Sequence, residues 1–144
     1  MTRDLVFETV YPHPPERVWG ALTDPRALAE WLMPNDFAPR VGHTFQFRTR
    51  PQPGFDGIVH CTVLELDPPR RLAYSWQGGP LAQPTIVTWT LEAIPEGTHL
   101  RLEHKGFAGA AGLAVSFLLG RGWRGLVERK LRAWLAGMEN QEGC

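Results

Sequence analysis

The chain has 144 residues, of which 43% are hydrophobic, as in a single globular domain. Its formal net charge is zero, so it lacks the positive excess of a nucleic-acid-binding domain. The two cysteines show no disulfide or metal-site spacing, the start shows no signal-peptide pattern, and no apolar run reaches the ~18 residues that span a bilayer. We therefore expect one cytoplasmic domain over residues 1–144, with neither a nucleic acid nor a membrane as partner.

The first third of the chain predicts a strand followed by two short helices. Residues 3–11 alternate between two faces, which is typical of a strand. Pro15 suits the first turn of a helix, and Asp24 followed by Pro25 ends it. Asp24 is then placed to cap a second short helix that stops at Pro34.

The middle of the chain predicts a run of strands. Segments 43–49, 57–66, 72–77, 85–93 and 98–105 are separated by turns rich in Pro and Gly. Alternation predicts these inward side chains: Phe45, Phe47, Leu72, Tyr74, Trp76, Val87, Trp89, Leu91, Leu100, Leu102 and His104. His99, Arg101, Glu103 and Lys105 fall on the opposite face, whereas segment 57–66 is apolar on both faces and leaves the direction of His60 open. This pattern predicts an antiparallel sheet with one face covered.

Residues 123–138 predict a long amphipathic helix. Its apolar stripe comprises Trp123, Val127, Leu131, Trp134 and Met138. Arg124, Glu128 and Arg132 lie opposite at four-residue spacing, which predicts mutual ion pairs. Lys130 falls at the edge of the stripe, where its amine reaches either water or an anionic ligand. The order of elements predicts an α+β fold in which a curved antiparallel sheet wraps around the C-terminal helix.

The stretch GFAGAAGLAVSFLLG, residues 106–120, carries no charged side chain. Leu113, Phe117 and Leu118 have helical spacing, which predicts a short helix ahead of the long one. An exposed apolar helix is a liability unless something covers it. Two interpretations stay open: a lid over an apolar pocket, or a homodimer interface through residues 106–120.

Four motifs carry a resemblance to a known family. They are PPERVWGALTDPRALAEWL, LELDPPRRLAYSW, GTHLRLEHKGF and the GW at 122–123. In this order they resemble the START-like (SRPBCC) superfamily with its helix-grip fold, and more narrowly the family named after the activator of the heat-shock-protein-90 ATPase. The resemblance covers nearly the whole chain and implies a cavity between sheet and long helix for an apolar or aromatic small molecule. The family often has a polar, acidic stretch where this chain has AGAAGLAVSFLLGR.

Alternation and the resemblance together predict a ligand site. The predicted ligand-binding residues are Phe45, Tyr74, Trp76, Trp89, His104, Phe117, Trp123, Val127, Lys130 and Trp134. His104 has two interpretations: a cavity imidazole that orients a ligand or transfers a proton, or a core histidine bonded to its neighbours. The second is the more common fate of a buried polar group.

No catalytic motif emerges, and the histidines are scattered: His99 and His104 face opposite sides of one strand and cannot share a metal. We expect no metal and no cofactor, and the leading hypothesis is a non-enzymatic binding protein for a small hydrophobic or aromatic ligand. An alternative is a polyketide cyclase- or dehydratase-like enzyme that uses the same cavity with His104 as its one acid or base. A co-chaperone-like accessory role ranks last, because in the family's namesake that activity depends on a further N-terminal domain.

Overall fold

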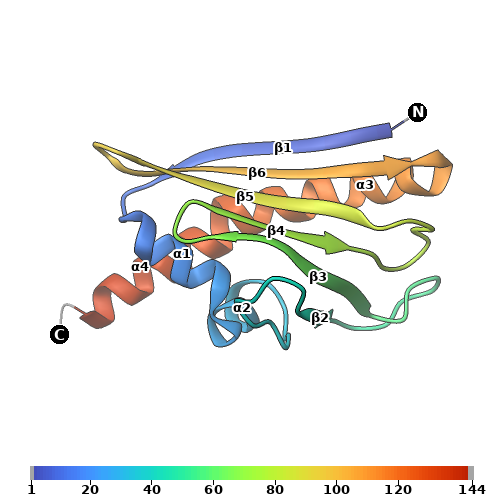
Figure 1. Ribbon diagram of the computed structural model, residues 1–144, viewed down its shortest axis with the longest axis horizontal. Helices are drawn as coiled ribbons and strands as arrows, with labels where there is room; N and C mark the ends of the chain where they lie inside the picture. The colour runs from blue at the N-terminus through green and yellow to red at the C-terminus, as the bar shows by residue number, and fades with distance from the viewer. Residues whose placement is uncertain (1, 143–144) are drawn as a thin grey trace.

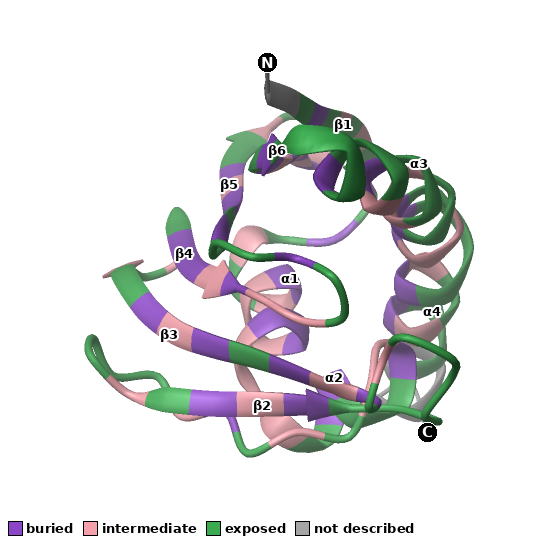
Figure 2. Cartoon of the chain, turned by 90° about the vertical axis from the view of Figure 1, so that its right-hand side faces the viewer, coloured by how far each residue is buried: buried purple, intermediate pink, exposed green. Residues whose placement is uncertain are grey.

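Antiparallel strands form one curved sheet, and a long helix lies across its open side (Figures 1 and 2). The computed structural model describes residues 2–142, with side-chain surroundings for residues 4–137. The six strands are β1 (Thr2–Tyr11), β2 (Thr44–Arg48), β3 (Ile58–Asp67), β4 (Arg71–Trp76), β5 (Thr85–Ile94) and β6 (Gly97–Ala108). They lie side by side in the order β1-β6-β5-β4-β3-β2, so β1 and β2 are the edges. The predicted α+β fold class is confirmed.

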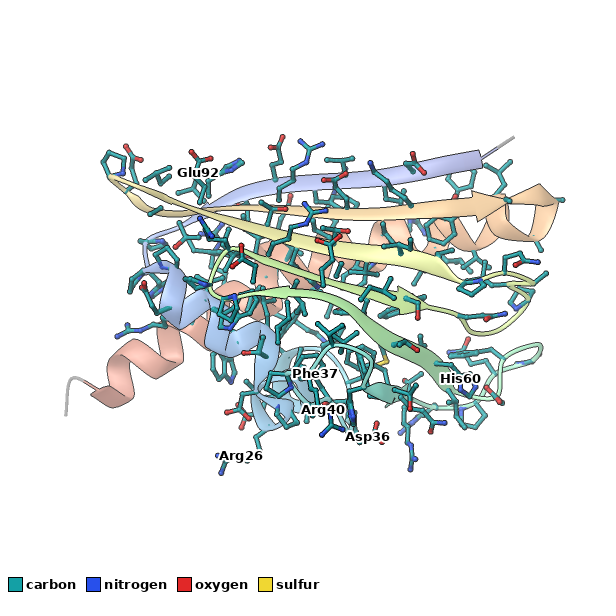
Figure 3. All side chains as sticks on the ribbon, in the orientation of Figure 1. Arg26, Asp36, Phe37, Arg40, His60 and Glu92 are labelled. Carbon is teal, nitrogen blue, oxygen red and sulfur yellow. The ribbon has the colours of Figure 1, made fainter. Side chains whose placement is uncertain are left out.

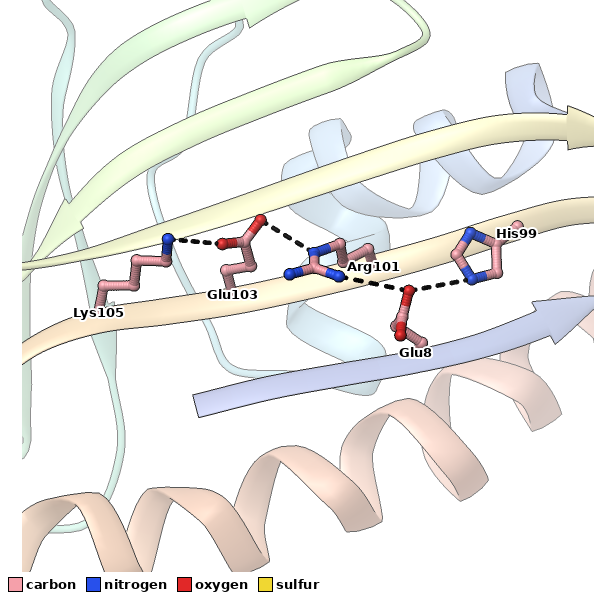
Figure 4. A network of polar contacts seen from close by, with 5 residues as sticks. All are labelled: Glu8, His99, Arg101, Glu103 and Lys105. Carbon is pink, nitrogen blue, oxygen red and sulfur yellow. Dashed lines mark hydrogen bonds and ion pairs between the residues drawn. The ribbon is translucent and has the colours of Figure 1, made fainter. Parts of the chain in front are cut away.

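The sheet has the covered and wet faces that the alternation predicts. Antiparallel register sets Val87 opposite His104 and Trp89 opposite Leu102, so inward residues of neighbouring strands stack on the concave face. On the convex face the Glu8 carboxylate lies 3.4 Å from His99 Nε2 and accepts a hydrogen bond from Arg101, and Glu103 accepts from Arg101 and Lys105 (Figure 4). The hydrogen bond from Lys105, followed by the one from Arg101, holds the pKa of Glu103 below its usual value.

Two short helices follow β1, as predicted. Helix α1 (Pro15–Thr23) has a proline in its first turn. The Asp24 carboxylate accepts a hydrogen bond from the Arg26 backbone N–H at 2.9 Å and so caps α2 (Pro25–Trp31). The inward faces of both helices, including Val18, Leu22 and Leu28, are buried in the core.

The C-terminal helix is longer than predicted and includes the apolar stretch. Helix α3 (Gly109–Gly125), a π-helical turn η1 (Leu126–Lys130) and α4 (Leu131–Glu142) follow one another without a break (Figure 1). The prediction of a separate short helix ahead of the long one was therefore wrong. Residues 109–122 contain alanines and leucines, which favour a helix, and no proline, so the helix continues through them despite its glycines. No helix within residues 2–142 is long and apolar enough to cross a bilayer.

The π-helical turn changes which residues face the sheet. The Leu131 N–H donates to the Leu126 carbonyl, five residues back, where an α-helix would pair residues four apart. Trp123, Val127, Leu131 and Leu135 are buried, whereas Trp134 is only half-buried. Leu135, which the predicted stripe omitted, takes the place given there to Trp134; the side chain of Met138 lies outside the described residues.

The polar face of this helix also differs from the prediction. Lys130 is exposed, and Arg124, Glu128 and Arg132 make no ion pairs with one another among the described side chains. Both arginines turn toward β1 instead of Glu128: Arg124 stands over the Phe7 ring, and Arg132 donates to the Thr9 hydroxyl at 2.8 Å. The predicted mutual pairing was wrong for this reason.

Candidate ligand-binding site

The aromatic residues predicted as pocket walls form a closely packed core between sheet and helix. Phe45, Tyr74, Trp76, Trp89, Trp123 and Val127 are all at most 4% exposed. Ring contacts run from Trp31 through Trp89, Trp123 and Trp76 to Phe47, with centroids 5.3–6.0 Å apart. These rings occupy the space in which the resemblance placed a cavity.

His104 lies at the centre of this core and is fully bonded. The Trp123 indole N–H donates to its Nδ1 at 2.9 Å, so in the neutral ring the proton sits on Nε2. Nε2 lies 2.7 Å from the Thr85 hydroxyl oxygen and donates to it, and that hydroxyl donates to the Trp76 carbonyl at 2.7 Å. Burial lowers the pKa of His104 from 6.5 to about 3, so the ring is neutral at physiological pH. Both ring nitrogens already form hydrogen bonds, so neither is available to bind a ligand in this arrangement.

Other interior polar groups are satisfied in the same way. The Tyr11 hydroxyl donates to the Val127 carbonyl at 2.6 Å, and Trp89 Nε1 donates to the Tyr74 hydroxyl at 3.0 Å. Within residues 4–137 no buried side-chain nitrogen or oxygen lacks a hydrogen-bond partner. The core therefore presents no polar anchor in need of a ligand.

The remaining predicted site residues lie apart from this core. Lys130 and Phe117 are exposed, and Trp134 on α4 donates its indole N–H to Glu30 of α2. His60 points outward from β3, where it lines a small surface recess of about 310 Å³ beside the glycines of the β4–β5 loop (Figure 3). Within the described part of the chain, no three His, Cys, Asp or Glu residues gather to hold a metal ion.

A larger recess lies on the surface, between the edge strand β1 and helix α3. It is a groove of about 650 Å³, and its lining residues are Asp4, Leu5, Val6, Phe7, Phe117, Gly120, Arg121, Arg124, Gly125, Glu128 and Arg129. Of the residues predicted as a site, Phe117 alone lines it. We call this recess the β1–α3 groove.

Side chains of both elements shape the β1–α3 groove. Leu5 packs against the helix at Gly120, where an added Cβ would lie 3.7 Å from its Cδ2. The Arg124 guanidinium stands over the Phe7 ring, 5.9 Å from its centroid. Arg129 folds back over Gly125, with Nη2 3.1 Å from where a Cβ would be. The result is an apolar floor with a charged rim.

Two features of the sequence are related to this groove, although the sequence analysis did not predict a groove from them. The segment GRGWRG places glycines inside a helix, where glycine is unfavourable, and sets arginines between them. The alternation of β1 also predicts that Val6 points outward, and in the structure it is 45% exposed on this edge strand. Neither signal shows that β1 and the helix meet, because that contact joins segments more than a hundred residues apart.

Comparison with known proteins assigns the family. Residues 12–136 match the family model described as activator of Hsp90 ATPase homolog 1-like protein, which covers most of the chain. The chain belongs to this family. Its fold is of the SRPBCC type that the resemblance implied. A search of curated proteins found no match.

Solved structures of similar proteins share this fold. Protein MLL2253 from Mesorhizobium loti is 38% identical, with 93% of this chain and 97% of that chain covered and a TM-score of 0.83. Protein BH1534 from Bacillus halodurans is 29% identical, with 94% and 99% covered and a TM-score of 0.77. DynU16, a putative protein in the dynemicin biosynthetic locus, is 24% identical over 92% of this chain and 47% of that chain, with a TM-score of 0.77, and shares the fold alone.

Proposed function

We propose that the protein binds a small apolar or aromatic molecule, and that this molecule lies in the β1–α3 groove. The observation that carries the proposal is the contrast between the two sides of α3. On its inner side the aromatic side chains are buried and the described polar side chains among them are hydrogen-bonded, whereas on its outer side an open recess of about 650 Å³ has an apolar floor. That volume is in the range of small-molecule sites.

The floor of the groove offers apolar contacts to such a ligand. Leu5 is buried beneath it, Phe7 is half-buried, and Phe117 is 56% exposed at its side. Each Å² of apolar surface covered by a ligand contributes about 25 cal/mol of favourable free energy. Two phenylalanine rings on one small recess suit a flat or branched apolar body.

A site within the aromatic core is the competing location. The family resemblance supports it, and the residues predicted from sequence would line it. Entry would require Trp76, Trp123 and their neighbours to move apart, which breaks the contacts of His104 with Trp123 and Thr85. The groove requires no such opening, and we favour it for this reason.

Binding of the neutral dye Nile red tests the proposal and separates the two locations. The variant Gly120→Phe places a ring in the groove, and its matched control Gly122→Phe adds the same ring on open surface. We expect the wild type and Gly122→Phe to bind the dye and Gly120→Phe to lose at least about ten-fold in affinity, or about 1.4 kcal/mol. Unchanged binding by Gly120→Phe, together with loss in Trp76→Ala, would place the site in the core and contradict the groove.

A homodimer through residues 106–120 is a second proposal, which rests on three exposed apolar side chains. Leu113, Phe117 and Leu118 of α3 are 43%, 56% and 71% exposed. Burying them against a second copy would remove this surface from water. Light scattering on the eluting protein is expected to give twice the monomer mass, falling to one monomer in Leu118→Glu. A wild-type monomer at high concentration would contradict this proposal.

A further inference from the structure

The rim of the β1–α3 groove carries arginines that have no anionic partner among the residues that the structure describes. Arg121, Arg124 and Arg129 line the groove, and none of them makes an ion pair or side-chain hydrogen bond with any residue that the structure describes. The fourth arginine of the same helical segment behaves differently, because Arg132 donates to the Thr9 hydroxyl. A guanidinium presents five donors in a planar fork suited to carboxylates.

Glycines keep the floor between these arginines open. Gly120 and Gly125 both line the groove, although glycine inside a helix costs about 0.5–1 kcal/mol relative to alanine. A side chain at Gly120 would project toward Leu5, and one at Gly125 would meet the Arg129 guanidinium. The helix is thus locally destabilised by glycine at the positions where larger residues would fill the recess.

The charge of the rim matches a single negative charge. Asp4 and Glu128 also line the groove, so together with the three arginines they leave one net positive charge. Asp4 is already engaged, because its carboxylate accepts from the Gly106 N–H at 3.2 Å. The rim therefore complements a monoanion better than a dianion.

We infer that the ligand of this groove is an amphipathic carboxylate, with its apolar body against Leu5 and Phe7 and its carboxylate bound by Arg121 and Arg124. This inference rests on the proposed function, since it names the class of molecule held in the same groove. Arg124 stands over the Phe7 ring, so the cation adjoins the apolar floor and one small molecule reaches both.

Three probes with one ring system and different charges test the inference: naphthoate, naphthalenemethanol and naphthylmethylammonium, each titrated by calorimetry. We expect the wild type to bind naphthoate about ten-fold more tightly than the neutral alcohol, and the cation most weakly. The preference for naphthoate should shrink as salt is added, because the arginines are exposed.

A double variant assigns the preference to named residues. Arg121→Gln with Arg124→Gln is expected to bring naphthoate to the affinity of the alcohol and to leave the alcohol unchanged. The control, Arg26→Gln with Arg50→Gln, removes the same charge from exposed arginines that do not line the groove and should keep the preference.

Two results would overturn the inference while the proposed function stands. In the first, the wild type binds all three probes with equal affinity and Gly120→Phe abolishes this binding. In the second, naphthyl phosphate binds more tightly than naphthoate. Absence of binding by every probe, including Nile red, would overturn the inference and the proposed function together.

Discussion

The indole N–H of Trp123 donates to Nδ1 of His104 across 2.9 Å, and this bond joins the long helix to strand β6. It selects the Nε2-protonated form of the imidazole, which in turn bonds to Thr85 on β5. Three elements thus meet at one buried ring. These bonds explain how a polar residue is accommodated in an aromatic core.

Acid should destabilise the protein through His104. Its pKa is lowered from 6.5 to about 3 on folding, so between these values the unfolded chain binds a proton that the folded protein does not. The free energy of unfolding should therefore fall as the pH drops from 6.5 toward 3, by up to about 1.4 kcal/mol per pH unit from this group. Urea titrations of wild type and His104→Gln across this pH range measure how the free energy of unfolding depends on pH. Identical pH slopes in the two proteins would contradict the assignment.

Removal of the Trp123 donor should be costly. In Trp123→Phe the buried Nδ1 of His104 loses its partner and some ring volume is lost, so we expect a loss of about 2–4 kcal/mol in stability. The control Trp134→Phe removes an indole N–H that bonds to exposed Glu30, and should cost less than about 1 kcal/mol. Chemical denaturation compares the two. Equal losses of stability in the two variants would mean that the hydrogen bond to His104 contributes no more than the exposed bond to Glu30.

The hydroxyl of Tyr11 should stabilise the π-helical turn. It is buried and donates to the Val127 carbonyl within η1, and burial raises the pKa of Tyr11 above its usual value. Tyr11→Phe leaves that carbonyl without this donor, so we expect a loss of about 1–3 kcal/mol. Thr9→Val, which removes the half-buried acceptor of Arg132, should cost less. The expectation fails if Tyr11→Phe is as stable as the wild type by urea denaturation.

Gly122 does not line the β1–α3 groove, and its replacement should stabilise the helix. It is exposed, has a helical backbone and has nothing within 4 Å of an added Cβ. Gly122→Ala is therefore expected to raise stability by about 0.5–1 kcal/mol, seen as a higher Tm. Gly42→Ala is the control of opposite sign, because Gly42 has φ of +86° and alanine is strained there. A lower Tm for Gly122→Ala would indicate a contact that the structure does not show.

Cys61 should be unreactive in the folded protein. It lies in the core at 3% exposure, and burial raises the pKa of its thiol well above the usual value. In a Cys144→Ser background, iodoacetamide should label Cys61 only after denaturant is added. Mass spectrometry of the native protein checks this, and rapid native labelling would show that the β2–β3 region opens readily.

Local patterns in the sequence were sufficient to predict most of the sheet. Side chains of a strand alternate by geometry alone, so the inward positions of Phe45, Tyr74 and Leu100 follow from their spacing. The same rule placed His104 inward, and Asp24 with Pro25 marked the start of α2 because caps act over a few residues. Segment 57–66 is apolar on both faces, so alternation gave no contrast between them and the direction of the His60 side chain could not be predicted.

The sequence by itself thus determined the strands, the short helices, the family and the aromatic composition of the interior, because these depend on contacts near in the chain or on motifs. Only the tertiary structure decided that α3 begins at Gly109, that a π-helical turn moves Leu135 inward, that the predicted wall residues pack against one another, and that an arginine-rimmed groove lies beside β1. Each of these features depends on how side chains from segments far apart in the sequence pack and place their charges. The periodicity of one segment does not show which other segment it packs against.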